Sequence, residues 1–208
     1  MENERENNAV LLIGTAAGEA GFSHRSRERC FYTLPLTVRR LSGTEDRLNL
    51  LLDAGFLRER AIFPGARLGL RGELRSFNNH SGQGSRLVLS VFVRELWDAL
   101  EDDANEVCLT GSLCKPPNFR RTPMGREICD LLLAVNRRYG RADYLPCIAW
   151  GRSAREAADW PVGGPVSLRG RLQSRKYVKQ LPEGSVERVA YEVSVVEFIG
   201  ENNIKDKG

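Results

Sequence analysis

The chain repeats one sequence pattern at a spacing of about 97 residues, and this repeat limits the folds that it can adopt. Residues 31–40, FYTLPLTVRR, align with residues 128–137, ICDLLLAVNR, so that their alternating apolar positions coincide. The pattern L-R-G-x-L-x-S occurs at 70–76 and again at 168–174. Shared anchors in the same order indicate a duplicated domain, because a period of this length is too long for a solenoid repeat.

The duplication predicts two domains of similar length. We expect the first to span residues 1–97 and the second residues 106–199, with an acidic linker at 98–105 and a short polar tail at 200–208. Each domain carries net positive charge, with 14 basic against 11 acidic residues in the first and 15 against 10 in the second.

Within each copy, alternating apolar runs predict three strands, which lie at 10–15, 31–40 and 49–52 and again at 107–113, 128–138 and 144–150. A short helix is expected next, at 55–62 and at 154–160, because each segment ends at a Pro and Gly break. Two further strands close each copy, with bulges expected at Gly72 and Gly170. The predicted fold class is therefore all-β. It consists of two tandem OB-folds, which are five-stranded Greek-key barrels, each with a short helix between strands 3 and 4.

The reactive residues indicate neither catalysis nor metal binding. The five cysteines show no C-x-x-C spacing, and the two histidines, His24 and His80, lie far apart in the sequence. We expect no enzyme activity, no cofactor and no metal site. The first eight residues, MENERENN, lack the apolar core of a secretory signal, and no apolar run is long enough to cross a bilayer. These features predict a cytoplasmic protein without a membrane partner.

Arginine dominates the basic residues, with 26 Arg against 5 Lys. The planar guanidinium forms paired hydrogen bonds with phosphate and stacks on flat rings, which the Lys ammonium does not do. An arginine-rich solvated surface would have the same composition, so the ratio alone does not identify a nucleic-acid-binding protein.

Five motifs in the second copy occur in order over about 95 residues. They are N-x-V-x-L-x-G-x-L, P-x-x-R-x-T-P-x-G, L-A-V-N-R, D-Y-x-x-C-I-A-W-G-R-x-A and G-R-L-Q-S-R-x-Y. In these motifs the second copy resembles the bacterial single-stranded DNA-binding protein family. The first copy looks like a diverged relative, since it keeps NAVLLIG, LPLTVRR and GELRSF but has LNLLLDAGF in place of LPCIAWGR.

The resemblance implies that the protein binds single-stranded DNA with little sequence preference, by stacking bases and contacting phosphates. That activity would protect strands during replication, recombination or repair. Family members usually assemble four OB-folds, so two in one chain imply a homodimer. They commonly end in an acidic tip that recruits partners, whereas this chain ends in GENNIKDKG, so recruitment through a tail is not predicted.

The family's stacking aromatics align with Tyr139, Tyr144, Trp150 and Tyr177. Cationic candidates in the same copy lie near strand ends and hairpins, and they are Arg120, Arg121, Arg137, Arg138, Arg152, Arg175 and Lys179. In the first copy the candidates are Arg39, Arg40, Arg47, Arg75 and Phe77. Rings and cations along one groove are what single-strand binding requires. Phe119 is a further candidate ring, while Phe22 is ambiguous between core packing and an interface.

Alternation along two strands predicts which side chains face solvent. Tyr144, Ile148 and Trp150 share one face of their strand, opposite Cys147 and Ala149, although strand aromatics often pack in a barrel core. In the last motif an arginine-rich face, with Arg169, Arg171 and Arg175, alternates with leucines. Two other functions stay open, namely an OB-fold module for protein interaction or primosome assembly, and binding of single-stranded RNA.

Overall fold

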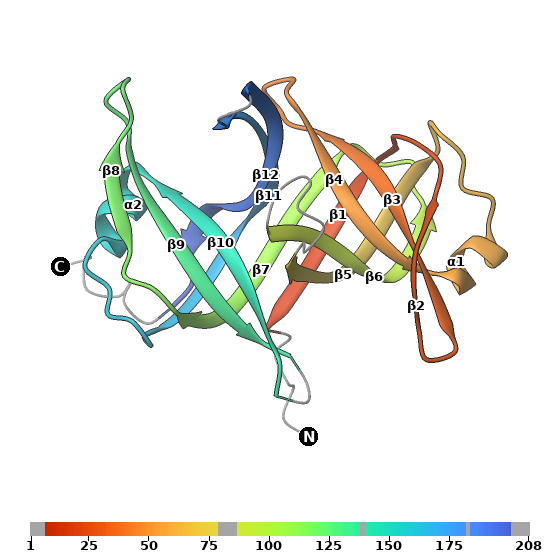
Figure 1. Cartoon of the computed structure of the whole chain (residues 1–208), viewed down its shortest axis with the longest axis horizontal. Coiled ribbons are helices and arrows are strands. Elements are labelled where there is room, and N and C mark those ends of the chain that lie inside the picture. The colour runs from red at the N-terminus through yellow and green to blue at the C-terminus, as the bar shows by residue number, and fades with distance from the viewer. Residues whose placement is uncertain (1–6, 79–86, 138–139, 182–183, 201–208) are drawn as a thin grey trace. The chain divides into compact units, whose positions relative to one another are not determined.

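Figure 1 shows a computed structural model of the whole 208-residue chain. The structure describes residues 7–78, 87–137, 140–181 and 184–200. By internal contacts the chain divides into two compact units. The N-terminal unit comprises Val10–Asn105 and Gln173–Tyr191, and the C-terminal unit comprises Glu106–Leu172, the residues up to Ala9 and those from Glu192 onward.

The first copy of the repeat forms a closed barrel. Its elements are β1 (Asn8–Ala16), β2 (Gly21–Ser26), β3 (Arg29–Arg39), β4 (Glu45–Asp53), α1 (Ala54–Glu59), β5 (Arg67–Asn78) and β6 (Leu87–Asp98). Strand β1 pairs with β5 and, at Thr15 and Ala16, with β3. Strand β4 joins β3 on one side and runs parallel to β6 on the other. This closure, with α1 between β4 and β5, is the predicted OB topology.

The second copy repeats this arrangement. Its elements are β7 (Ala104–Leu113), β8 (Asn118–Arg121), β9 (Glu127–Asn136), β10 (Ala142–Trp150), α2 (Gly151–Ala157), β11 (Pro165–Leu181) and β12 (Gly184–Phe198). Strand β7 pairs with β9 and β11, and β10 pairs with β9 and, in parallel, with β12. The all-β fold with two OB barrels is therefore confirmed, since the same pairings close both copies.

Leucines and valines at alternating positions form both barrel cores. Leu34, Leu36, Leu48 and Leu50 are fully buried in the first, and their repeat positions Leu131, Leu133, Leu145 and Cys147 are buried in the second. A glycine occupies the equivalent position in a strand of each barrel, on β5 in the first and on β11 in the second. A Cβ at Gly72 would overlap the carbonyl of Phe92, and one at Gly170 would approach the carbonyl oxygen of Ser194 to 2.5 Å. The β5–β6 register shifts between Arg71 and Gly72, which is the bulge that the sequence predicts there.

Some elements differ from the sequence-based prediction. Strands β2 and β8 precede the second predicted strand of each copy and were not predicted, because every residue in them is exposed and no apolar alternation marks them. Both helices begin earlier than expected, at Ala54 and Gly151, because each helix follows its strand without a loop. The acids of the expected linker lie against the N-terminal unit, where Asp103 pairs with Arg67 and accepts the backbone N–H of Arg39 at 2.6 Å.

Candidate nucleic-acid interface

Strand β10 presents two aromatic rings to solvent. Leu145, Cys147 and Ala149 are buried, whereas Tyr144 and Trp150 on the opposite face are 51% and 39% exposed. Ile148 shares that outward face but is buried. Apart from Ile148, burial of these residues follows the alternation that the sequence predicts, and the two rings lie six residues apart on the strand.

Neighbouring strands extend this outward face. Opposite Tyr144 lies Ala134 of β9, and opposite Trp150 lies Ile128, which in turn faces Arg120 of β8. Directly paired residues project from the same side of a sheet, so Arg120 belongs to the face that carries the rings. We call Tyr144, Trp150 and Arg120 the β8–β10 face. Phe119 has the opposite parity, paired with the buried Cys129, and lies outside this face.

Acidic residues partner the cations around this face. The Arg120 Nε donates to the Asp130 carboxylate at 2.8 Å, and this interaction raises the pKa of Arg120 above its ordinary value. Arg155 and Arg121 both pair with Glu127, which lowers the pKa of that carboxyl, mainly through the hydrogen bond from Arg155. These pairs lie at the surface and contribute little to stability. Sequence reasoning missed Asp130, Glu127 and Arg155, because pairing across strands leaves no local motif.

Arg137 and Arg40, both candidates for phosphate contact, each bind a buried carboxylate. The Arg137 Nε donates a hydrogen bond to the Asp143 carboxylate at 2.6 Å. The guanidinium of Arg40 donates two hydrogen bonds of 2.6 Å to the Asp46 carboxylate. The Asp143 side chain is 0% exposed and that of Asp46 2%. A buried carboxylate requires such a partner. Each pair closes the hairpin between equivalent strands, β3–β4 and β9–β10.

Trp150 occupies a position where a tryptophan weakens the following helix. It is the N-cap residue of α2, and no side-chain hydrogen bond caps that helix. The same position of the first copy holds Asp53, whose carboxylate accepts the backbone N–H of Gly55 at 2.8 Å and caps α1. Asp is among the best N-caps, whereas an indole accepts no hydrogen bond there. The C-terminal unit therefore keeps an exposed ring where a small polar residue would stabilise the fold.

The first copy lacks both rings on the equivalent face. Arg47 stands at the position of Tyr144, and Asp53, paired with Arg29, stands at that of Trp150. The remaining candidates of this copy lie elsewhere. Arg39 is exposed at the end of β3, Arg75 pairs with Glu73, and Phe77 is 39% exposed near the end of β5. Phe22 on β2, at the repeat position of Phe119, is the most exposed of these rings.

Several of the predicted nucleic-acid-binding residues lie apart from the β8–β10 face or outside the residues that the structure describes. Arg152 is exposed on α2, two residues after Trp150. Arg175 and Tyr177 lie on the part of β11 that belongs to the N-terminal unit, with the guanidinium 5.9 Å above the ring. Arg138 and Tyr139 are outside the described residues, as is the side chain of Lys179.

Two of the five cysteines, Cys129 and Cys147, are buried. Burial raises the pKa values of Cys129 and Cys147, so both thiols stay protonated and unreactive. Among the residues that the structure describes, no group of three His, Cys, Asp or Glu side chains could hold a metal ion. None of the described helices is long and apolar enough to span a membrane.

The second copy of the repeat matches a known protein family. The single-strand binding protein family matches residues 104–199, which include β10, α2 and the whole β8–β10 face. The second copy is thus similar to members of this family. Single-stranded DNA-binding protein A of Bacillus subtilis is 37% identical over 83 residues, 36% of this chain and 48% of that protein. Single-stranded DNA-binding protein 2 of Listeria innocua is 36% identical over 80 residues, 35% of this chain and 50% of that protein.

The single-strand binding fold extends through the whole chain. The wild-type single-stranded DNA binding protein from Thermus aquaticus aligns with a TM-score of 0.71 at 22% identity, covering 92% of this chain and 91% of that one. At this identity the likeness establishes the fold alone. The chain spans about half the length of the curated relatives that it matches.

Proposed function

We propose that this protein binds single-stranded DNA with little sequence preference and shields it during replication, recombination or repair. The observation that carries the proposal is the exposed Trp150 at the uncapped N-terminus of α2, on the same strand face as Tyr144. Both rings offer flat surfaces on which any base can stack, at roughly 1–3 kcal/mol per base. Arg120 on the same face supplies a cation for the phosphates.

Further contacts extend the proposed interface. In the second copy we include Arg121, Arg138, Tyr139, Arg152, Arg175, Tyr177 and Lys179. In the first copy, Arg39, Arg47, Arg75 and Phe77 make weaker contacts, because the positions of Tyr144 and Trp150 hold Arg47 and Asp53 there. We also include Arg137 and Arg40, whose guanidinium groups neutralise buried aspartates in addition.

We propose further that the protein acts in the cytoplasm as a homodimer that presents four OB-folds, and that it needs no cofactor and catalyses no reaction. The two domains are proposed to be residues 1–97 and 106–199, joined by residues 98–105 and followed by a tail at 200–208. Sedimentation of the purified chain tests the assembly. A particle of twice the 23.3 kDa chain mass is expected, and a monomer at micromolar concentration contradicts the dimer.

Titration with oligo-dT at several salt concentrations tests the function. Binding should quench tryptophan fluorescence, and affinity should fall with salt at a log–log slope of about −0.7 per phosphate neutralised. Trp150→Phe should remove most of the quenching while retaining most of the affinity, which assigns the signal. Absence of binding to oligo-dT at low salt would refute the proposal, and tighter binding to oligo-U would indicate an RNA-binding protein.

A further inference from the structure

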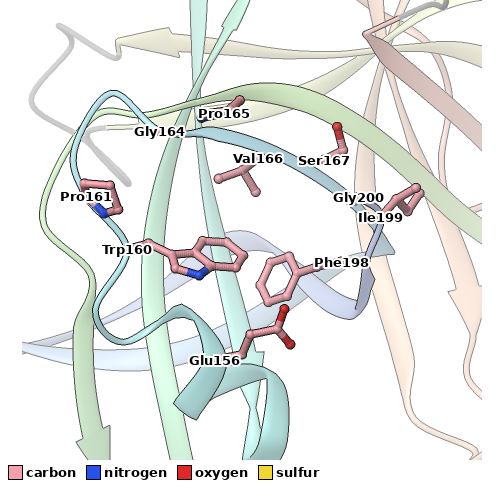
Figure 2. Close-up of a pocket in the computed structure, with 10 residues that line it drawn as sticks. All are labelled: Glu156, Trp160, Pro161, Gly164, Pro165, Val166, Ser167, Phe198, Ile199 and Gly200. Carbon is pink, nitrogen blue, oxygen red and sulfur yellow. The ribbon is translucent and has the colours of Figure 1, made fainter. Parts of the chain in front are cut away.

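A pocket of about 450 Å³ opens beside helix α2 in the C-terminal unit (Figure 2). Its volume lies within the range of roughly 300–1,000 Å³ that is usual for ligand sites. Trp160 and Phe198 form its wall, with ring centroids 4.5 Å apart in an edge-to-face arrangement. Val166, Ser167 and Ile199 are also among the lining residues, as is Glu156 of α2.

In the first copy of the repeat, a tryptophan side chain lies at the place that is equivalent to the pocket. Ile199 donates its backbone N–H to the carbonyl of Ser167 at 2.7 Å, so these two residues face each other across β11 and the end of β12. Their repeat positions are Trp97 and Gly69, which are paired in the β5–β6 ladder. The next cross-strand pairs agree, because Arg71 bonds Glu95 as Arg169 bonds Glu197.

An indole ring lies over Gly69 in the first copy. A Cβ at position 69 would overlap the Trp97 ring, so the glycine is required for the ring to lie there. In the second copy the tryptophan is replaced by isoleucine and the glycine by serine, and the pocket is found at these positions. The first copy thus identifies the kind of group that this surface accommodates, a flat aromatic side chain.

Charge at the pocket edge selects among aromatic partners. The Glu156 carboxylate points toward the Trp160 and Phe198 rings (Figure 2), and within the described part of the chain it forms no ion pair. The carboxylate of Glu156 repels the phosphates of a nucleic acid and attracts a Lys or Arg side chain. A nucleotide is therefore a poor occupant, and a basic peptide is a good one.

We propose that this pocket docks a partner protein through an aromatic side chain flanked by Lys or Arg. The aromatic ring takes the place that Trp97 fills in the first copy, and the flanking cation pairs with Glu156. None of the residues that line the pocket belongs to the β8–β10 face, so we expect a partner to bind while Tyr144 and Trp150 stack on bases.

Nuclear magnetic resonance on the full 15N-labelled chain tests the proposal, with the tripeptide acetyl-Lys-Trp-Lys-amide as probe. The peptide should shift the indole N–H resonance of Trp160 in a saturable manner. Acetyl-Lys-Ala-Lys-amide, with equal charge, should bind at least about tenfold more weakly, because no ring is buried. Glu156→Gln should weaken the Trp peptide by about twofold to fivefold, as expected for one exposed ion pair.

A plugged variant provides the matched control. Ser167→Gly combined with Ile199→Trp installs the arrangement of the first copy and should abolish peptide binding with oligo-dT affinity unchanged. Three outcomes would overturn the proposal. The two peptides could bind equally well, or the Trp peptide could bind the plugged variant as strongly as the unmodified protein. Oligo-dT could also shift the same Trp160 resonance and compete with the peptide. If the plugged variant does not fold, the comparison with the Ala peptide and the Glu156→Gln variant still tests the proposed pocket. If the unmodified protein binds the Trp peptide but not oligo-dT, only the proposed DNA-binding function is refuted.

Discussion

Trp150 and Asp53 occupy the same position in the two copies of the repeat, each as the N-cap of the helix that follows a barrel strand. Asp53 caps its helix with a hydrogen bond, and Trp150 leaves its helix uncapped while exposing an indole. The two copies thus differ in whether this position serves stability or presents a ring for binding. That difference underlies the first prediction.

Trp150→Asp should stabilise the fold and weaken DNA binding at the same time. The new carboxylate can cap α2, which contributes about 1 kcal/mol. Loss of one stacked base should weaken oligo-dT binding by about 5- to 150-fold. Urea unfolding and fluorescence anisotropy with labelled oligo-dT measure the two effects. Trp150→Ala is the control, because it should lose affinity without gaining stability, and a Trp150→Asp variant that binds normally contradicts the role of the indole.

Tyr144 and Arg47, which are equivalent in the two copies, should contribute in different ways. Tyr144→Ala removes a stacking ring and should weaken oligo-dT binding by about 5- to 150-fold with an unchanged salt slope. Arg47→Ala should reduce the slope by about 0.7 and weaken binding less at high salt, because it removes a phosphate contact. Anisotropy titrations over a series of salt concentrations separate the two. An identical response of both variants would show that the copies bind in the same way.

Alternation could predict the barrel and the β8–β10 face, because a strand with one buried side has a period of two. It placed Tyr144 and Trp150 opposite Cys147, and burial in the structure agrees. It could not predict β2 or β8, in which every residue is exposed. Nor could it show that Arg137 holds Asp143, since the two lie six residues apart on opposite sides of a hairpin. The pocket beside Trp160 depends on the pairing of β11 with β12, which the sequence alone does not provide.

Arg137→Ala should damage stability more than any exposed arginine substitution. It leaves the buried Asp143 carboxylate without its charged partner, which should cost roughly 3–5 kcal/mol of unfolding free energy. Arg121→Ala, which breaks an exposed pair with Glu127, should cost less than about 1 kcal/mol. Urea denaturation of both variants measures the difference. Comparable losses would indicate that Asp143 is solvated or bonded elsewhere.

Acidification should remove the contribution of the Asp53 carboxylate. Its pKa lies below the ordinary value of 3.8, chiefly because the Gly55 N–H bonds the charged form and, to a lesser extent, because Arg29 pairs with it. Since the folded chain binds this proton less readily than the unfolded chain, the stabilisation is complete above the ordinary value and is lost as the pH falls through the lowered one. Asp53→Asn keeps a capping side chain but has no charge to titrate. The difference in unfolding free energy between the two proteins should therefore shrink from about pH 5 to about pH 2, and a constant difference over this range would show that the charge of Asp53 does not stabilise the fold.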